Sequence, residues 1–330
     1  MQTFLPFASF ARSASVLDGP RLGKQRVETL QVLRALELSD YGWGNHPAVR
    51  MWRGYTPALA VYGLACVREW TRRGHADSTR ALIAEFAPGA ASQAQLARER
   101  LLPPWLGDVR LHVSHQAALV RKAPELYRDA FAEVDPTLEY HWPGGPDAST
   151  HQLQGTPLWV LRAPDPAAHR EWLEQGLVGL GNTAGIEQDI SGLGAGELKT
   201  LLRQCDPPRT AGKALRQLRT FVDEMQPGHP VAVIDPQDAG QLLVGVVVGG
   251  YAFRAATTTS AGMLPCHRRA VRWAGRLQRC DVHPPASLQD PRQLFRVGAD
   301  PEALAAAQHG LFNAQVFDAQ VSSSQAPAPG

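Results

Sequence analysis

The strongest constraint on the fold is a break in the chain at Pro143-Gly144-Gly145-Pro146, which is followed by a polar stretch up to Thr156. Proline lacks a backbone N–H, and glycine weakens regular structure, so this run ends any helix or strand that precedes it. A chain of 330 residues has room for about two ordinary domains. We therefore expect domains over residues 1–145 and 156–300. The small, polar carboxy-terminal residues predict a mostly disordered tail over 301–330.

The spacing of hydrophobic residues differs on the two sides of this break. Before it, Val27, Leu30 and Leu33 recur at helical spacing, and two further long runs have the same character. After it, short β-branched runs such as 231–234 and 242–248 alternate with helical stretches. The pattern predicts an α+β protein with an all-α first domain and a second domain that is a small β-barrel with helices.

Charge is distributed unevenly along the chain. The net formal charge is only +2, but residues 1–130 carry 17 Lys and Arg against 11 Asp and Glu, a net charge of +6. The other 200 residues carry 16 against 20, a net charge of −4. A basic amino-terminal part is the better candidate for contacts with phosphates, although a solvated basic face has the same composition.

Cysteine content and hydropathy bear on where the protein works. Four scattered cysteines are too few for a disulfide framework in a chain of this length, and they suit a reducing cytoplasm. The start of the chain lacks the basic and apolar regions of a secretory signal. No window approaches eighteen uncharged apolar residues, so we expect no spanning helix and a cytoplasmic location.

The segment from Leu17 to Glu28 carries the clearest chemical pattern. Arg21, Lys24, Glu28 and Gln31 are three or four residues apart, so on a helix they form one polar stripe. A carboxylate flanked by cations can stay ionised beside an anionic backbone. The alternative is a solvated helix face with a Lys24–Glu28 pair.

Three segments in order resemble the pyrimidine-dimer DNA glycosylases of phage endonuclease V type. The first is Leu17…Leu22…Glu28; the second is the turn Gly42–Pro47 with the helix that ends near Arg73-Gly74-His75. The third runs from Ser114 to Tyr127. Together they place the resemblance over roughly residues 1–142.

This resemblance implies a helical domain that kinks damaged DNA, extrudes a nucleotide and breaks its glycosidic bond, with Glu28 as the catalytic glutamate. Trp43, Trp52 and Trp105 are then candidates for stacking on bases, or else core residues. His112 and His115, three residues apart, could share a helix face and bind a metal, but a phosphate contact or a structural role is favoured because no third ligand is in view, and His115 is kept as a phosphate candidate. The nucleic-acid-binding candidates are Arg21, Lys24, Arg26, His46, Arg50, Arg53 and His115.

The amino terminus departs from the family. There the nucleophile is the α-amine of the second residue, exposed by removal of the initiator methionine. Here residue 2 is Gln, whose bulk usually blocks that removal, so Met1 becomes the candidate amine. A terminal amine suits the role because its pKa near 8 leaves a neutral fraction at physiological pH. The other possibilities are a water nucleophile or binding without cleavage.

Five segments of the second domain form an ordered set: Trp159–Arg162, a glycine turn at 176–181, a helix ending over Phe221–Gly228, a strand at Val231–Ile234, and His267–Trp273. In this order they resemble the PUA-like domain that precedes Mrr-type restriction endonucleases. Domains of that superfamily are small β-barrels, several of which hold a modified or flipped base. The resemblance implies a base pocket of Trp159, Trp273, Arg268 and Arg269, whereas the alternative places both tryptophans in the core.

Together these features predict a DNA glycosylase, with or without AP-lyase activity, that acts on damaged or modified bases in double-stranded DNA and is steered by a base-reading domain. The alternative is a non-catalytic reader of modified nucleic acid, with RNA less favoured than DNA. We expect no metal, no cofactor and no membrane partner.

Overall fold

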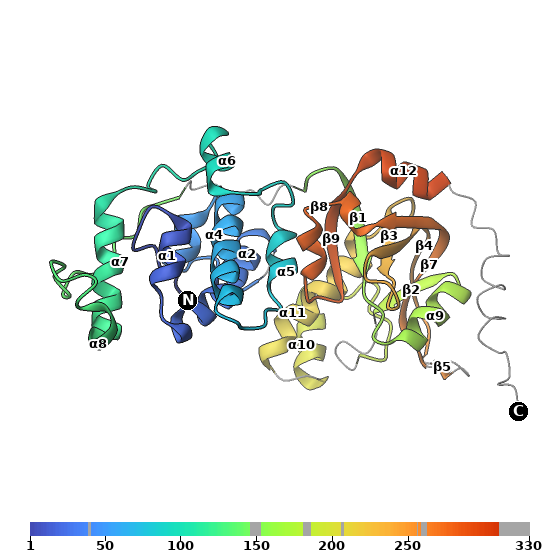
Figure 1. Cartoon of the computed structure of the whole chain (residues 1–330). Coiled ribbons are helices and arrows are strands. Elements are labelled where there is room, and N and C mark those ends of the chain that lie inside the picture. The colour runs from blue at the N-terminus through green and yellow to red at the C-terminus, as the bar shows by residue number, and fades with distance from the viewer. Residues whose placement is uncertain are drawn as a thin grey trace, which may run out of the picture. The chain divides into compact units, whose positions relative to one another are not determined.

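The computed structural model describes residues 1–38, 41–145, 153–180, 186–205, 208–255, 257–258 and 263–309 (Figure 1). The chain divides into two compact units: the first comprises Met1–Gln152 and Pro284–Ser287, and the second comprises Leu153–His283 and Leu288–Gly330. In the first unit the described regular elements are all helices. They are α1 (Phe10–Val16), α2 (Gly19–Glu37), α3 (Pro47–Trp52), α4 (Thr56–Arg72), α5 (Arg80–Ala84), α6 (Gln93–Arg98), α7 (Val109–Lys122) and α8 (Pro124–Tyr127).

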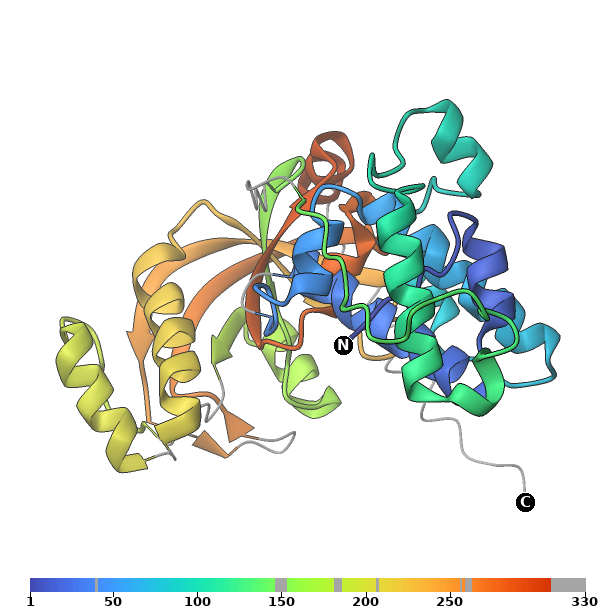
Figure 2. The same ribbon diagram turned by 90° about the vertical axis from the view of Figure 1, so that its left-hand side faces the viewer.

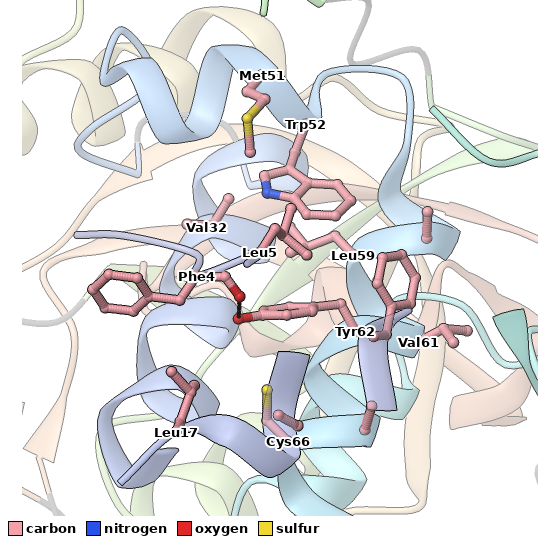
Figure 3. Close-up of a cluster of buried hydrophobic side chains, with 14 of the residues drawn as sticks. Phe4, Leu5, Leu17, Val32, Met51, Trp52, Leu59, Val61, Tyr62 and Cys66 are labelled. Carbon is pink, nitrogen blue, oxygen red and sulfur yellow. Dashed lines mark hydrogen bonds between the residues drawn. The ribbon is translucent and has the colours of Figure 1, made fainter. Parts of the chain in front are cut away.

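Helices α2 and α4 form the centre of the first unit. Helix α2 begins where the sequence offers start signals, because the Asp18 side chain accepts from the Arg21 N–H at 2.8 Å and Pro20 occupies the first turn. The two helices approach closely at Gly63, where an added Cβ would lie 2.6 Å from the Thr29 side chain. This contact places the buried face of α2 against the apolar core around Tyr62 and Trp52 (Figure 3).

The second unit is built on a seven-stranded sheet with the order β2-β7-β4-β3-β1-β9-β8. Only β1 and β3 pair in parallel among these neighbours. The longest strands, β4 and β7, are the orange pair in Figure 2. The strands are β1 (Thr156–Leu161), β2 (Leu177–Leu180), β3 (Pro230–Ile234), β4 (Gln241–Phe253), β7 (His267–Gln278), β8 (Val282–His283) and β9 (Leu294–Ala299), and a separate pair is β5 (Thr257–Thr258) with β6 (Met263–Leu264).

Helices cover both faces of this sheet. The first face packs against α9 (Pro166–Glu174), α10 (Ala195–Cys205), α11 (Pro208–Arg219) and the π-helical turn η1 (Thr220–Glu224). The opposite face packs against α12 (Pro301–His309). Short 3-10 turns, η2 (Arg279–Asp281) and η3 (Pro285–Gln289), lie between β7 and β9.

The sheet corrects the expected β-barrel. It is open and mixed, because its end strands β2 and β8 do not pair with each other. The physical reason lies in the strands themselves: Leu158, Trp159, Val160 and Leu161 are consecutive and all buried, so β1 is covered on both faces. A sheet covered on both faces by helices hides its apolar surface without closing.

The carboxy-terminal part also differs from the expected disordered tail at its start. Residues 301–309 form α12, whose Leu304 and Ala307 are buried. Residues 310–330 lie outside the described residues. In the part of the chain that is described, no helix has the length and apolar character needed to cross a membrane.

Candidate active site at the amino end

Helix α2 presents Glu28 on an open groove of about 680 Å³. Lys24, Val27, Glu28 and Gln31 follow one another at helical spacing along this groove, and Trp70 and His75 line it as well. The predicted polar stripe is therefore real for Lys24, Glu28 and Gln31. The fourth member, Arg21, instead pairs with Asp18 at the start of α2.

Residues 3–6 run through the core of the first unit outside any helix or strand. Thr3, Phe4 and Leu5 are 5% exposed or less, although this segment pairs with no strand. Buried backbone groups need hydrogen-bond partners. Here side chains supply them: the Pro6 carbonyl accepts from Gln116 at 2.8 Å, and the remaining partners come from α2, α4 and α7.

Gln25 of α2 is the first of these partners. Its amide is buried, with Nε2 donating to the Gln2 carbonyl at 3.1 Å and Oε1 accepting from the Phe4 N–H at 2.8 Å. The Tyr62 hydroxyl lies 2.8 Å from the Phe4 carbonyl oxygen, a contact drawn in Figure 3, and 2.7 Å from Gln25 Oε1. The Gln25 side chain thus fixes the amino-terminal segment at two points, Gln2 and Phe4.

Two histidines of α7 hold the next residue, Leu5. The Leu5 N–H donates to His115 Nδ1 at 2.9 Å. His112 Nε2 accepts from the Gly107 N–H at 3.1 Å, so its proton sits on Nδ1, which donates to the Leu5 carbonyl at 2.8 Å. Burial, reinforced by the charges of His112 and His141, lowers the pKa of His115 to about 3. His115, predicted to contact phosphate, is 0% exposed and holds the backbone instead.

These contacts bring the start of the chain to Glu28. The Gln2 N–H donates to Glu28 Oε2 at 3.1 Å, and Gln25 Nε2 donates to the same oxygen at 3.2 Å. No cation among the described residues forms an ion pair with Glu28, so the Lys24–Glu28 pair of the alternative interpretation is not formed. The carboxylate is therefore held by neutral donors and borders an open groove.

His46 lies within electrostatic range of both Glu28 and the terminal amine. It is the N-cap residue of α3, where its Nδ1 accepts from the Ala48 N–H at 3.2 Å. Burial lowers the pKa of His46, the positive amino terminus lowers it further, and the Glu28 carboxylate opposes them. A neutral imidazole in electrostatic range of an amine and a carboxylate can accept or relay a proton.

An aromatic pair from the segment after α8 adjoins this cluster. Tyr140 and Trp142 have ring centroids 5.2 Å apart, and Trp142 meets His46 edge-on at 6.5 Å. Burial, with a smaller contribution from Glu28, raises the pKa of Tyr140 to about 12. The phenol therefore stays neutral at physiological pH.

The predicted phosphate contacts divide into paired and free cations. Arg26 is ion-paired to Asp77 and lies over the Trp70 ring at 4.3 Å, and Arg53 Nη2 donates to the Gly44 carbonyl at 2.8 Å. Lys24 and Arg50 are exposed, and their side chains have no partner among the described residues. These two are the cations most available to an external anion.

The three tryptophans proposed to stack on bases also separate. Trp52 is fully buried and donates from Nε1 to Thr3 Oγ1 at 3.0 Å. Trp105 is 6% exposed, and its Nε1 donates to the Met51 carbonyl at 3.2 Å. Both are core residues, whereas Trp43 is 64% exposed.

The predicted base pocket of the second unit is not assembled. Trp159 on β1 and Trp273 on β7 belong to the same buried face, but β3 and β4 lie between their strands. Three strand spacings of about 4.8 Å put them about 14 Å apart. Successive side chains along β7 point to alternate faces of the sheet. Arg268 lies five residues before Trp273, an odd number, so the two side chains point to opposite faces.

Arg269 serves the fold rather than a pocket. It is 1% exposed, and its guanidinium donates to the carbonyls of Phe221 and Val222 in η1, both at 2.8 Å. Burial lowers the pKa of this arginine. Its guanidinium N–H groups donate hydrogen bonds to carbonyls that a π-helical turn leaves without partners.

Sequence reasoning did not identify Gln25, Tyr140 or Trp142. Gln25 had a signal, because it falls on the apolar face of α2 between Leu22 and Thr29, where a polar side chain needs a buried partner. Tyr140 and Trp142 lie outside any helix or strand and carried no periodic signal. In the described part of the chain, no group of three or more His, Cys, Asp or Glu side chains could hold a metal ion.

Comparison with known proteins bears on the first unit. A family model described as pyrimidine dimer DNA glycosylase matches residues 1–82. No curated protein and no solved structure matches the chain. The expected resemblance is therefore confirmed for residues 1–82, and the PUA-like resemblance of the second domain finds no match. The matched range contains Gln25, Glu28 and His46, whereas the α7 residues that hold Leu5 and Pro6 lie outside it.

Proposed function

We propose that the first unit is a DNA glycosylase that breaks the N-glycosidic bond at a pyrimidine dimer, with Glu28 as its catalytic carboxylate. The observation that carries this proposal is the contact between Glu28 Oε2 and the Gln2 nitrogen, made beside an open groove. The similarity of residues 1–82 to pyrimidine dimer DNA glycosylases supports it. The second unit stays outside the proposal, because its predicted pocket residues lie apart.

The chemistry uses the amino end of the chain as the nucleophile. A neutral amine attacks C1′ of the extruded nucleotide, and the N-glycosidic bond breaks with its electrons leaving on the base, which takes up a proton from solvent. After the nitrogen has lost one proton, the C1′–O4′ bond opens, the ring oxygen takes up the second amine proton, and an imine forms between the nitrogen and C1′. The ionised Glu28 stabilises the positive charge that develops on the sugar. His46, near both groups, accepts the proton released from the amine.

The terminal amine takes one of two positions. With Met1 present, its α-amine is the nucleophile and acts near His46. The Gln2 nitrogen is then an amide and only donates a hydrogen bond to Glu28. Removal of Met1 would turn that nitrogen into an amine at hydrogen-bond distance from Glu28. Intact-mass measurement of the purified protein distinguishes the two positions.

The proposal is tested with duplexes that carry a single pyrimidine dimer. We expect glycosidic cleavage at the dimer, none in the undamaged duplex, and a covalent adduct after borohydride reduction. Peptide mapping should place the adduct on the first residue present. Preferential binding without glycosidic cleavage would instead identify a non-catalytic reader. An adduct on Lys24, which lines the same groove, would overturn the terminal amine as nucleophile.

The free cations supply the proposed contacts with the DNA backbone. Each phosphate contact contributes about one unit to the dependence of log affinity on log salt. We expect Arg50→Gln to weaken binding to all duplexes alike and to lower that slope by about one. The matched control is Arg26→Gln, which removes a cation already paired with Asp77. Equal slopes for wild type and Arg50→Gln would contradict a phosphate contact at Arg50.

A further inference from the structure

Every polar position of the buried Gln25 amide has a partner. A glutamine side chain offers two N–H donors and one oxygen with two lone pairs. Nε2 donates to the Gln2 carbonyl at 3.1 Å and to Glu28 Oε2 at 3.2 Å. Oε1 accepts from the Phe4 N–H at 2.8 Å and lies 2.7 Å from the Tyr62 hydroxyl oxygen. The amide therefore bridges four groups at once.

These partners fix which way round the amide lies. A reversed amide would set its oxygen against the Glu28 carboxylate and the Gln2 carbonyl, and its NH₂ group against the Phe4 N–H. Gln25 is 1% exposed, so water cannot replace the bonds that such a reversal would break. The donor end of the amide consequently faces Glu28.

The donor end joins the two parts of the proposed chemistry, the carboxylate and the amino-terminal segment. Glu28 Oε2 accepts from Gln25 and also from the Gln2 N–H at 3.1 Å. Glu28 Oε1 has no hydrogen-bond partner in the part of the chain that the structure describes, and Glu28 lines the groove. One oxygen of the carboxylate is thus held, while the other stays available to a substrate.

We propose that Gln25 is a positioning residue for glycosidic cleavage: it holds Glu28 and the amino end at a fixed separation and leaves Glu28 Oε1 to face the sugar. This inference rests on the function proposed above. Gln25 is buried and does not line the groove, so it reaches the reaction only through Glu28 and Gln2. A misplacement of about 1 Å in a site can lower a rate on the order of 100-fold. Loss of the bridge should therefore slow cleavage more than it weakens DNA binding.

Gln25→Met tests this role, because methionine keeps the length of the side chain and removes its hydrogen bonds. We expect single-turnover cleavage of a dimer-containing duplex, measured at saturating protein, to fall about tenfold. The dissociation constant should stay within a few-fold of wild type. The yield of the adduct trapped by borohydride at the amino end should fall with the rate, since the Gln2 carbonyl is no longer held.

Gln116→Met is the matched control. Gln116 also holds the amino-terminal segment, but its amide donates to the Pro6 carbonyl at 2.8 Å rather than to Glu28. Both variants should lose thermal stability, because each leaves a backbone carbonyl of this segment without its donor. Only Gln25→Met should lose cleavage rate.

Gln25→Glu provides a measurement that does not depend on overall stability. Glutamate keeps the acceptor oxygen for the Phe4 N–H, but it donates toward Glu28 only when it is protonated. Two ionised carboxylates at this distance repel each other, so the ionised form should displace Glu28 and the protonated form should hold it. The rate divided by the wild-type rate at the same pH should therefore rise as the pH falls from about 8 to about 6. The same ratio for Gln25→Met should stay constant.

Three results would overturn the inference. They are a Gln25→Met rate within a few-fold of wild type, an equal loss of rate in Gln116→Met, and a Gln25→Glu ratio that does not change with pH. If Gln25→Met does not fold, the Gln25→Glu ratio decides alone. If the wild-type protein neither releases the base nor forms an adduct, the proposed function fails instead, whatever the Gln25 variants do.

Discussion

Glu28→Gln should lower the rate of glycosidic cleavage by at least about 100-fold while leaving the affinity for dimer-containing DNA within a few-fold of wild type. Charge stabilisation by a positioned group contributes on this scale, and a neutral amide cannot replace the carboxylate opposite a developing positive charge. The Gln oxygen can still accept from the Gln2 N–H, so the amino end should stay in place. Single-turnover kinetics with binding measured in parallel checks both parts.

Gln31→Ala is the matched control for this experiment. Gln31 lines the same groove one turn further along α2, and the proposal gives it no chemical role. Its cleavage rate should remain within a few-fold of wild type. A Glu28→Gln enzyme that retains the wild-type rate would remove Glu28 from the catalytic machinery.

Acid should destabilise the first unit through His115. Burial holds its pKa at about 3, against about 6.5 in the unfolded chain. The unfolded state therefore binds a proton that the folded state rejects. The contribution of His115 is fully present above pH 6.5, and it declines by about 1.4 kcal/mol per pH unit as the pH falls from 6.5 toward 3. Denaturant unfolding at pH 7, 5.5 and 4.5 measures the decline.

His115→Asn isolates this contribution from that of the other titrating groups. Asn offers an oxygen where His115 Nδ1 accepts from the Leu5 N–H, but it does not titrate. We expect the variant to be less stable than wild type at pH 7 and the difference to shrink as the pH falls. Parallel stability curves for the two proteins over this range would show that His115 does not cause the acid sensitivity.

The sequence was sufficient to predict much of α2 and its exposed stripe. Asp18 and Pro20 mark the start of the helix, and the three-and-four spacing put Lys24, Glu28 and Gln31 on one face. Such inferences use only neighbours within one or two turns. The pairing of Arg21 with Asp18 could have been predicted in the same way, because the two residues are three positions apart.

Features that depend on distant partners could not be read in this way. Leu5 meets His115 across 110 residues, and no local pattern marks a segment whose backbone is satisfied by side chains of other helices. The same limit applies to the second unit. Strand spacing alone does not distinguish a closed barrel from an open sheet, because closure depends on whether helices cover both faces.

The course of the amino-terminal segment also bears on when activity can arise during synthesis. The amino-terminal segment is synthesised before α7, which supplies the partners of Leu5 at separations of 107 and 110 residues. Contacts this distant in sequence form late, after the intervening loop has closed. A nascent chain that stops before α7 lacks the histidines that hold Leu5. Incomplete chains should therefore lack an ordered site.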